Sequence, residues 1–259
     1  MFILEGFDMK VAVCVSGIAR GSVQKNMDLI QNAFGDVDFF FATWKGKEKD
    51  LEKYGITDYK TFDEPFIDYH PLADVPEDIM PPVMKTWSLR ERIKTDFVLR
   101  ERMQHQSKQI LGHSLLLKSI PKKYDMIIRA RYDTLVSDKA DLRHWLNLSY
   151  KEKKAIGFGT RTSRWNKLHE LYVLPHVWPD RYQPSPGVSN DWGGYIMDPL
   201  ILHPRKLFDH KRCWNLHSKK SLLAAERGFY QILSQPYGDT HESIYGGAQI
   251  EKYLKDTVH

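Results

Sequence analysis

The sequence predicts an α/β protein with a mostly parallel central sheet flanked by helices. Three short apolar segments, at 10–17, 39–44 and 126–128, have the composition of buried strands. Strands that are apolar on both faces are typical of parallel sheets, because helices cover both sides. Segments with helical spacing alternate with these strands in the first half of the chain, and a mixed second half follows. No linker, internal repeat or low-complexity tract divides the chain, so we interpret residues 1–259 as one domain.

The first strand leads into a loop with two glycines and then into an amphipathic helix. Four apolar residues are spaced three or four apart on this helix and form one stripe: Val23, Met27, Ile30 and Phe34. A charged segment at 45–53 is predicted to be an exposed helix. Five prolines interrupt residues 54–86, which we therefore expect to be irregular.

The second half of the chain is predicted from shorter signals. The expected helices span 94–119, 138–148, 219–233 and 250–254, with Asp138 opening the second of them. A strand with two glycines is expected at 155–159, and another is expected within 190–197. Residues 160–190 are rich in arginine, aromatic residues and proline, and we expect an irregular loop on the acceptor side of a site.

Composition narrows the class of protein. The net charge of +5 suits a polyanionic ligand such as a nucleotide diphosphate, although a solvated basic surface explains it equally well. The two cysteines, Cys14 and Cys213, lie far apart, and Cys14 is predicted to be a buried thiol in a reducing, cytoplasmic setting. The apolar runs are too short for a transmembrane helix, the first residues do not form a signal peptide, and no nucleic-acid-binding motif is present.

Charged residues follow the third predicted strand directly. Arg129, Arg131 and Asp133 would share one face if the strand continues, because side chains alternate along a strand. Burying such charges without partners is costly. Ligands of open α/β sheets bind outside the carboxyl ends of strands, so we expect a metal and phosphate site here. The alternative is a structural pair between an arginine and a nearby aspartate: Asp125, Asp133 or Asp138.

The loop after the first strand is a second candidate for phosphate binding. Its glycines, beginning with Gly17, let backbone N–H groups approach an anion, and Arg20 can pair with phosphate. The pattern is neither GxGxxG nor a Walker P-loop, so a plain strand-to-helix turn is an equal alternative. On the predicted 94–119 helix, Gln106 and Lys108 are minor candidates, since a polar helical face is usually only solvated.

Taken in order, several blocks resemble nucleotide-sugar glycosyltransferases of the GT-A fold. The resemblance is greatest to small bacterial and phage enzymes of lipopolysaccharide- or capsule-type glycan synthesis. The blocks that carry it are 11–20, 36–44, 124–133, 190–194 and 241–242. It implies a single GT-A-like domain with a nucleotide-diphosphate donor, a UDP-sugar by family preference, and a glycan or other hydroxyl acceptor.

The resemblance also implies roles for individual residues. The nucleotide would contact Ser16, Gly17 and Arg20. The other candidate contacts of the nucleotide sugar, which come from the residues themselves, are Lys108, Arg129 and Arg131. A divalent ion, Mn²⁺ or Mg²⁺, would be held by Asp133 with His241 as a later ligand. The segment Arg131-Tyr-Asp-Thr is not a literal Asp-x-Asp, but one carboxylate can anchor such an ion when diphosphate and water complete its shell.

An inverting transferase also needs a carboxylate base near the acceptor hydroxyl. Asp191, beside Trp192 and a glycine pair, is the first candidate, and Glu242 is the second. Their structural alternatives are a turn or cap residue for Asp191 and a helix-start acid for Glu242. The predicted function is metal-dependent sugar transfer. A nucleotide-sugar hydrolase and a binding module without turnover are the alternatives.

Overall fold

The computed structural model describes ten parts of the chain. They are residues 9–66, 88–90, 108–136, 141–159, 196, 198–213, 229, 232–233, 241–245 and 248–250. For 159, 241–245 and 248–250 the description is of the backbone.

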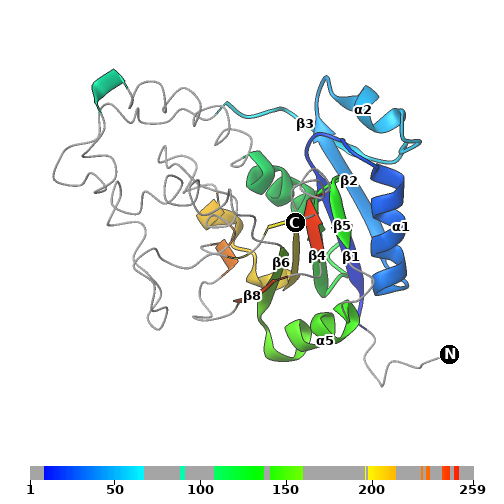
Figure 1. Cartoon of the computed structure of the whole chain (residues 1–259), viewed down its shortest axis with the longest axis vertical. Coiled ribbons are helices and arrows are strands. Elements are labelled where there is room, and N and C mark those ends of the chain that lie inside the picture. Colours follow the sequence, from blue (N-terminus) through cyan, green and yellow to red (C-terminus); the bar gives the residue numbers. More distant parts are fainter. Residues whose placement is uncertain are drawn as a thin grey trace.

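The described core is a seven-stranded sheet in the order β3-β2-β1-β4-β7-β6-β8 (Figure 1). Its neighbours pair in parallel except on the two sides of β7, which runs antiparallel to both β4 and β6. The predicted α/β class and mostly parallel sheet are therefore confirmed. The strands span Val11–Ser16 (β1), Asp38–Trp44 (β2), Lys60–Phe62 (β3), Met126–Ala130 (β4), Ala155–Gly159 (β6), Leu200–Pro204 (β7) and His241–Tyr245 (β8).

Helices cover both faces of this sheet, as the double-sided burial of its strands requires. Helices α1 (Val23–Phe34) and α5 (Leu142–Glu152) pack on one face, and a helix with described residues 108–119 packs on the other. Figure 1 shows α1 and the helix of residues 108–119 on opposite sides of the sheet. Successive β1 residues alternate between the two cores, with Val13 toward α1 and Cys14 toward residues 108–119.

Two local predictions are confirmed by this packing. The predicted stripe of α1 is buried in full: Val23, Met27, Ile30 and Phe34. Cys14 is a buried free thiol, and burial raises its pKa to about 12, so the thiol stays protonated at neutral pH. Helix α2 (Glu48–Glu52) lies within the segment predicted to be a charged helix.

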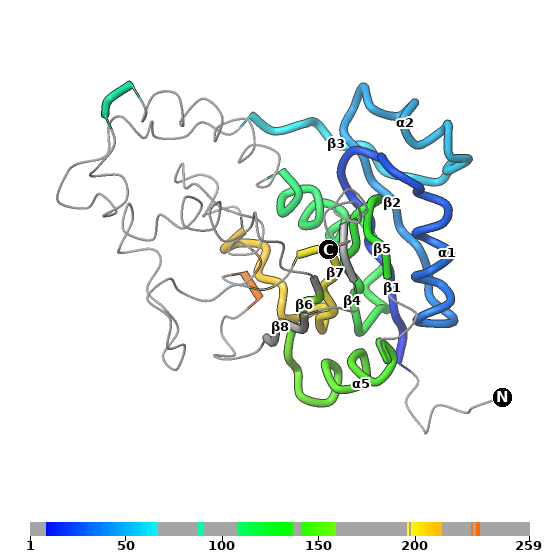
Figure 2. The backbone as a smooth tube through the Cα atoms, viewed as in Figure 1, coloured from blue at the N-terminus to red at the C-terminus, as the bar shows by residue number. Residues whose placement is uncertain are grey.

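Strand order creates a switch point between β1 and β4. After β1 the chain builds β2 and β3 on one side, and it returns to β4 on the other side of β1. Figure 2 follows the tube through these neighbouring strands. Ligands of open α/β sheets bind outside the carboxyl ends of the strands at such a point. We therefore expect a ligand to bind at the two loops that follow Ser16 and Ala130.

Two sequence predictions were wrong within the described residues. Strand β3 lies inside 54–86, where it pairs with β2, and so that segment is not irregular throughout. The strand expected within 190–197 falls almost wholly outside the described residues, and strand β7 begins at Leu200. Ile250 belongs to strand β9 (Ala248–Ile250), which pairs with β5 (Thr134–Val136), and so no helix begins there. Partner strands supplied hydrogen bonds that local propensity does not reveal.

The start of α5 also differs from the prediction. Its N-cap is Asp141, whose side chain accepts a hydrogen bond from the His144 backbone N–H at 3.0 Å. Asp138, predicted to open this helix, lies outside the described residues, as do residues 160–190. Strand β2 is fully buried only from Ala42 to Trp44.

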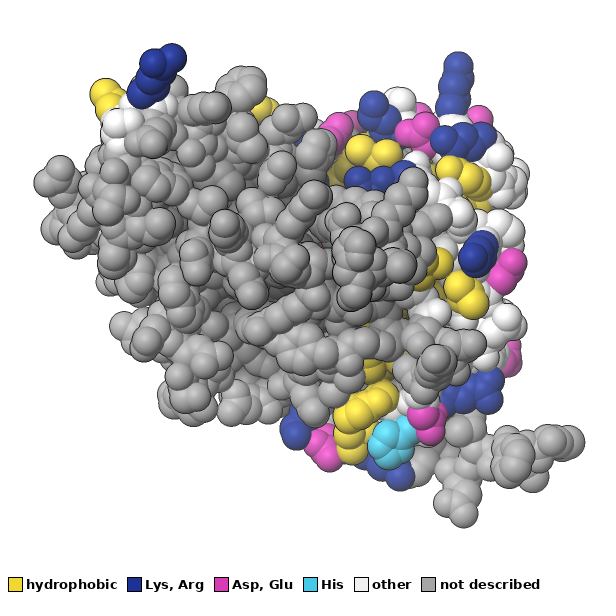
Figure 3. Space-filling model, in the orientation of Figure 1, with side chains coloured by type: hydrophobic (Ala, Val, Ile, Leu, Met, Phe, Trp, Pro, Cys, Tyr) yellow, Lys and Arg dark blue, Asp and Glu magenta, His cyan; other side chains and the backbone are white. Residues whose placement is uncertain are grey.

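The described helices and surface add two further observations. Within the described parts of the chain, no helix combines the length and apolar character needed to cross a membrane. On the described part of the face in Figure 3, basic and acidic side chains are interspersed.

Candidate functional site

The turn after β4 contains the central residues of the candidate site. Strand β4 ends at Ala130, so the condition under which Arg129, Arg131 and Asp133 would share one strand face is not met. The Thr134 hydroxyl accepts a hydrogen bond from the Arg131 backbone N–H at 2.9 Å and donates one to the Pro199 carbonyl at 2.6 Å. The Thr134 side chain thus bonds to backbone groups that would otherwise pair with a neighbouring strand. The backbone therefore turns after Ala130 and does not continue as a strand.

Hydrogen bonds of Tyr132 connect the same turn to strand β2 and helix α1. The Tyr132 hydroxyl donates to the Ala42 carbonyl at the end of β2 at 2.9 Å, and Asn26 of α1 donates to the Tyr132 carbonyl at 2.9 Å. Tyr132 is buried, and burial raises its pKa although the bond to Ala42 acts against the shift. These contacts hold the backbone on either side of Asp133 in one position.

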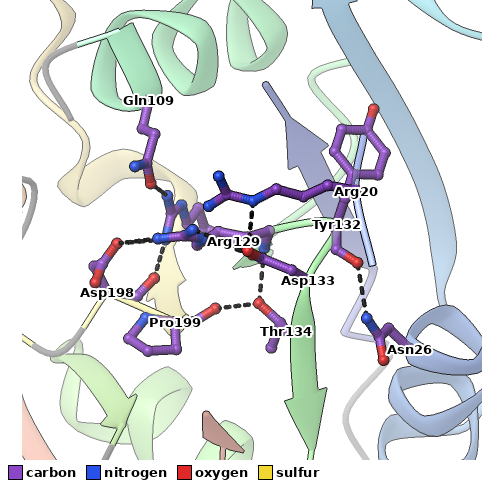
Figure 4. A network of polar contacts seen from close by, with 10 residues as sticks. Arg20, Asn26, Gln109, Arg129, Tyr132, Asp133, Thr134, Asp198 and Pro199 are labelled. Carbon is purple, nitrogen blue, oxygen red and sulfur yellow. Dashed lines mark hydrogen bonds and ion pairs between the residues drawn. The ribbon is translucent and has the colours of Figure 1, made fainter. Parts of the chain in front are cut away.

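Asp133 accepts hydrogen bonds from two arginines, Arg20 and Arg131, and Figure 4 shows its contact with Arg20. Arg131 approaches it with both Nε, at 2.8 Å from Oδ1, and Nη2, at 3.1 Å from Oδ2. Arg20 donates from Nε to Oδ2 at 2.7 Å. Asp133 is only 4% exposed, so these are bonds of a buried carboxylate. The Arg20–Asp133 pair joins the loop after β1 to the loop after β4 across the switch point.

The charge of Asp133 is set by opposing effects. Burial alone raises the pKa of its carboxyl, but the charges and hydrogen bonds of Arg131 and then Arg20 outweigh burial and hold the pKa below its ordinary value of 3.8. Asp133 is therefore a carboxylate at neutral pH. The structural Arg–Asp pair considered as an alternative exists between Arg131 and Asp133.

Arg129, in strand β4, is buried in the protein interior. It is 1% exposed, donates to Gln109 Oε1 at 2.7 Å, and lies over the Phe229 ring at 4.8 Å. It also donates to the Asp198 carbonyl, and the Asp198 carboxylate lies 3.6 Å from both Arg129 and Arg131. Arg129 thus contacts the protein interior, and its predicted contact with phosphate remains a prediction.

Sequence reasoning missed two members of this group. Asp198 is 2% exposed and stands just before β7, two residues ahead of the strand. A charged residue beside an apolar strand was the same signal that identified Arg129, and it was available for Asp198. Gln109 had no such signal, because it lies on a helix whose polar residues looked like a solvated face.

The loop after β1 is the second part of the site and lies next to the turn after β4. Ser16 is buried, and the φ of Gly17 is +117°, a conformation that favours glycine. The Gly17 N–H donates to the Ala42 carbonyl at 3.1 Å, while a Cβ built on Gly17 would meet nothing within 4 Å. The backbone at Gly17 is therefore open on its side-chain face. Gly112 of the opposite helix lies close enough that an added Cβ would be 3.5 Å from Ser16 Oγ.

The remaining predicted residues are placed elsewhere or lie outside the description. Lys108 forms a 2.8 Å ion pair with Glu64 in the segment after β3. His241 and Glu242 belong to strand β8, so Glu242 is not a helix-start acid. Gln106 and Asp191 lie outside the described residues.

The register of β8 separates His241 from Asp133. His241 pairs with Ala155 of β6, so two strands, β6 and β7, stand between β8 and β4. Neighbouring strands lie about 4.8 Å apart, which puts β8 about 14 Å from β4. The structure does not bring the two predicted metal ligands together along the sheet.

The described residues do not fit a divalent ion at Asp133. No group of three or more metal-ligating side chains occurs among them. The two carboxylates of the site each face guanidinium groups, so both oxygens of Asp133 already accept charge-assisted hydrogen bonds. Among the described residues, three guanidiniums (Arg20, Arg129 and Arg131) face two carboxylates (Asp133 and Asp198), an excess of one positive charge. Such a balance suits an anion.

Replacing Thr134 with valine is expected to lower the free energy of unfolding by about 2 kcal/mol, because two buried backbone groups lose their partner. Thr134→Ser keeps the hydroxyl and should retain most of the stability. Urea denaturation of the three proteins measures the difference. Equal losses in both variants would mean that the hydroxyl does not hold the turn.

No protein-family model and no curated protein matches this chain. Among solved structures, it is similar to 4-diphosphocytidyl-2C-methyl-D-erythritol synthase from Anaerococcus prevotii, with a TM-score of 0.45, 8% identity, and coverage of 92% of this chain and 89% of that chain. It is also similar to core-mannan synthase A from Aspergillus fumigatus in its Mn/GDP form, with a TM-score of 0.45, 9% identity, and coverage of 90% and 72%. A glycosyltransferase involved in glycosylation of the major capsid of PBCV-1 gives a TM-score of 0.41, 9% identity, and coverage of 93% and 92%.

Proposed function

We propose that this protein is a glycosyltransferase that moves a sugar from a nucleotide-diphosphate donor to a hydroxyl acceptor. The observation that carries the proposal is the Arg20–Asp133–Arg131 cluster at the switch point between β1 and β4. It stands where α/β sheets bind ligands, and its net positive charge suits a diphosphate. The blocks of sequence that resemble GT-A enzymes contain the same residues.

The chemistry explains why cations are needed at this place. Transfer breaks the bond between the anomeric carbon and a phosphate oxygen, and a new bond forms from that carbon to the acceptor oxygen. Negative charge grows on the departing diphosphate, so guanidiniums placed there stabilise the transition state more than the ground state. Because Asp133 and the turn hold Arg131 in position, little reorganisation is required when the charge develops.

The finer assignments follow the family resemblance. A UDP-sugar is the first candidate donor, and a glycan of the lipopolysaccharide or capsule type is the first candidate acceptor. The acceptor hydroxyl must lose a proton, and Asp191 and then Glu242 are the candidate bases. Mn²⁺ or Mg²⁺ at Asp133 with His241 stays a prediction, and the steps above do not use it.

A panel of UDP-, GDP-, CDP-, ADP- and dTDP-sugars tests the proposal. We expect one donor to be cleaved faster when a glycan acceptor is added, with the sugar recovered on the acceptor. Equal release with and without every acceptor would indicate a hydrolase. Nucleotide binding without any cleavage would indicate a binding module, and the transferase proposal would fail in either case.

Replacing Gly17 with alanine is expected to weaken nucleotide binding as well as stability. Alanine at φ +117° strains the backbone, at a cost of about 1–2 kcal/mol, and the Cβ would stand on the open face of the loop. Gly55→Ala is the control, since Gly55 has φ +73°, open space around its Cβ, and a position after α2. Calorimetric titration with UDP should show weaker binding for Gly17→Ala only. Equal affinities would remove Gly17 from the site.

A further inference from the structure

The carboxylate predicted to bind a metal is fully engaged with arginine side chains. Oδ1 of Asp133 accepts from Arg131 Nε at 2.8 Å. Oδ2 accepts from Arg20 Nε at 2.7 Å and from Arg131 Nη2 at 3.1 Å. The side chains of Asp133 and Arg131 are 5% and 11% exposed, so water contributes little to either.

We propose that Asp133 is a positioning residue that orients Arg20 and Arg131, and that these two guanidiniums bind the donor diphosphate without a divalent cation. This inference rests on the proposed function and names how the same site holds its ligand. It replaces the expected roles of Asp133 and His241 as metal ligands.

Charge and geometry favour an anion over a cation at this position. A divalent ion bound to Asp133 would lie beside two guanidiniums and would compete with three charge-assisted hydrogen bonds. Arg131 would then lose its 2.8 Å contact with Asp133, while Asp198 stays 3.6 Å away. A diphosphate is attracted by the same guanidiniums and leaves the buried pair intact.

Arg20 provides the donors that reach the ligand. Its side chain is 53% exposed, and its Nε is held by Asp133. Its two terminal nitrogens have no hydrogen-bond partner among the described residues. Figure 4 shows the guanidinium of Arg20 directed across the site toward the Arg129 side, away from Tyr132. A guanidinium fixed at Nε with its terminal nitrogens free presents the geometry that binds phosphate oxygens in pairs.

Nucleotide titrations of the full chain test the role of the metal. UDP, GDP, CDP and ADP are each titrated at one ionic strength, in EDTA and in Mn²⁺. We expect the nucleotide that binds best to change its Kd by less than about threefold between the two conditions. Binding that is more than about tenfold tighter in Mn²⁺ would overturn the inference and leave the transferase proposal standing. No binding in either condition would overturn the proposed function itself.

Variants test the role of Asp133. In EDTA, Arg20→Ala should weaken binding by about tenfold to a hundredfold, because charge-assisted bonds to phosphate are lost. Arg143→Ala is the matched control: Arg143 lies on α5, where it donates to the Ala33 carbonyl at 3.1 Å, and its loss should leave the Kd unchanged.

A double-mutant cycle separates positioning from a merely structural role. Asp133→Asn keeps the shape of the side chain and removes the charge that orients Arg20. If Asp133 acts through Arg20, adding Asp133→Asn to Arg20→Ala should weaken binding much less than Asp133→Asn does alone in the native chain. Independent, additive effects of the two substitutions would overturn the positioning role.

Discussion

Asp133→Ala is expected to lower the free energy of unfolding by about 3 kcal/mol, because it removes the carboxylate that lies 2.8 Å from the buried Arg131 guanidinium. The loss lies at the lower end of the range for broken buried pairs, since Asp198 remains 3.6 Å from Arg131. The burial of the Arg131–Asp133 pair makes a loss of stability part of the expected result.

Urea denaturation followed by circular dichroism measures this effect. Glu152→Ala is the control, because Glu152 forms an ion pair of similar length, 2.7 Å, with Lys154 on the surface. Exposed pairs contribute little, so the control should change stability by less than about 0.5 kcal/mol. Equal stability of the Asp133→Ala and Glu152→Ala proteins would show that the Asp133 pair is not buried as described.

Stability is expected to fall by about 3 kcal/mol or more as the pH drops from 6.5 to 4, because of a buried histidine pair. Nε2 of His113, in the helix of residues 108–119, lies 3.3 Å from Nε2 of His203 in β7. Nδ1 of His203 faces the Pro204 carbonyl at 2.9 Å and must donate to it. In the neutral pair, His203 Nε2 therefore accepts the proton of His113 Nε2.

The direction of the pH effect follows from the pKa values. Burial lowers the pKa of His203 from 6.5 to about 4, despite its hydrogen bond to Pro204. Burial, and then His203 and Arg129, lower the pKa of His113 well below 6.5. Below pH 6.5 the unfolded chain binds protons that the folded chain excludes, so stability is lost as the pH falls toward the folded pKa of about 4.

Denaturation at a series of pH values measures this loss. His203→Asn removes one titrating group and should reduce the slope between pH 6.5 and 4 by up to about 1.4 kcal/mol per pH unit. His144→Gln, a change at an exposed histidine on α5, is the control. The assignment fails if His203→Asn has the same slope as the native chain.

Much of the fold could be predicted from local patterns. The apolar runs identified β1, β2 and β4, and the spacing of Val23 to Phe34 identified α1, because a helical stripe and a buried strand leave periodic marks in sequence. Strands β3 and β9 were missed, since each is three residues long and exists through its partner strand. Their hydrogen bonds come from residues far away in the chain.

The sequence by itself determined the α/β class and the presence of charged residues after β4. Both are local features, because apolar runs mark the buried strands and the charged residues follow one of them directly in the chain. Only the tertiary structure decided how that charge is neutralised. The partner of Asp133 on the β1 side, Arg20, lies 113 residues earlier in the chain, and Asp198 reaches the cluster from the start of β7. Asp133 was therefore expected to face a metal and instead faces two guanidiniums. Strand order, which local sequence does not encode, brings those groups together at the switch point.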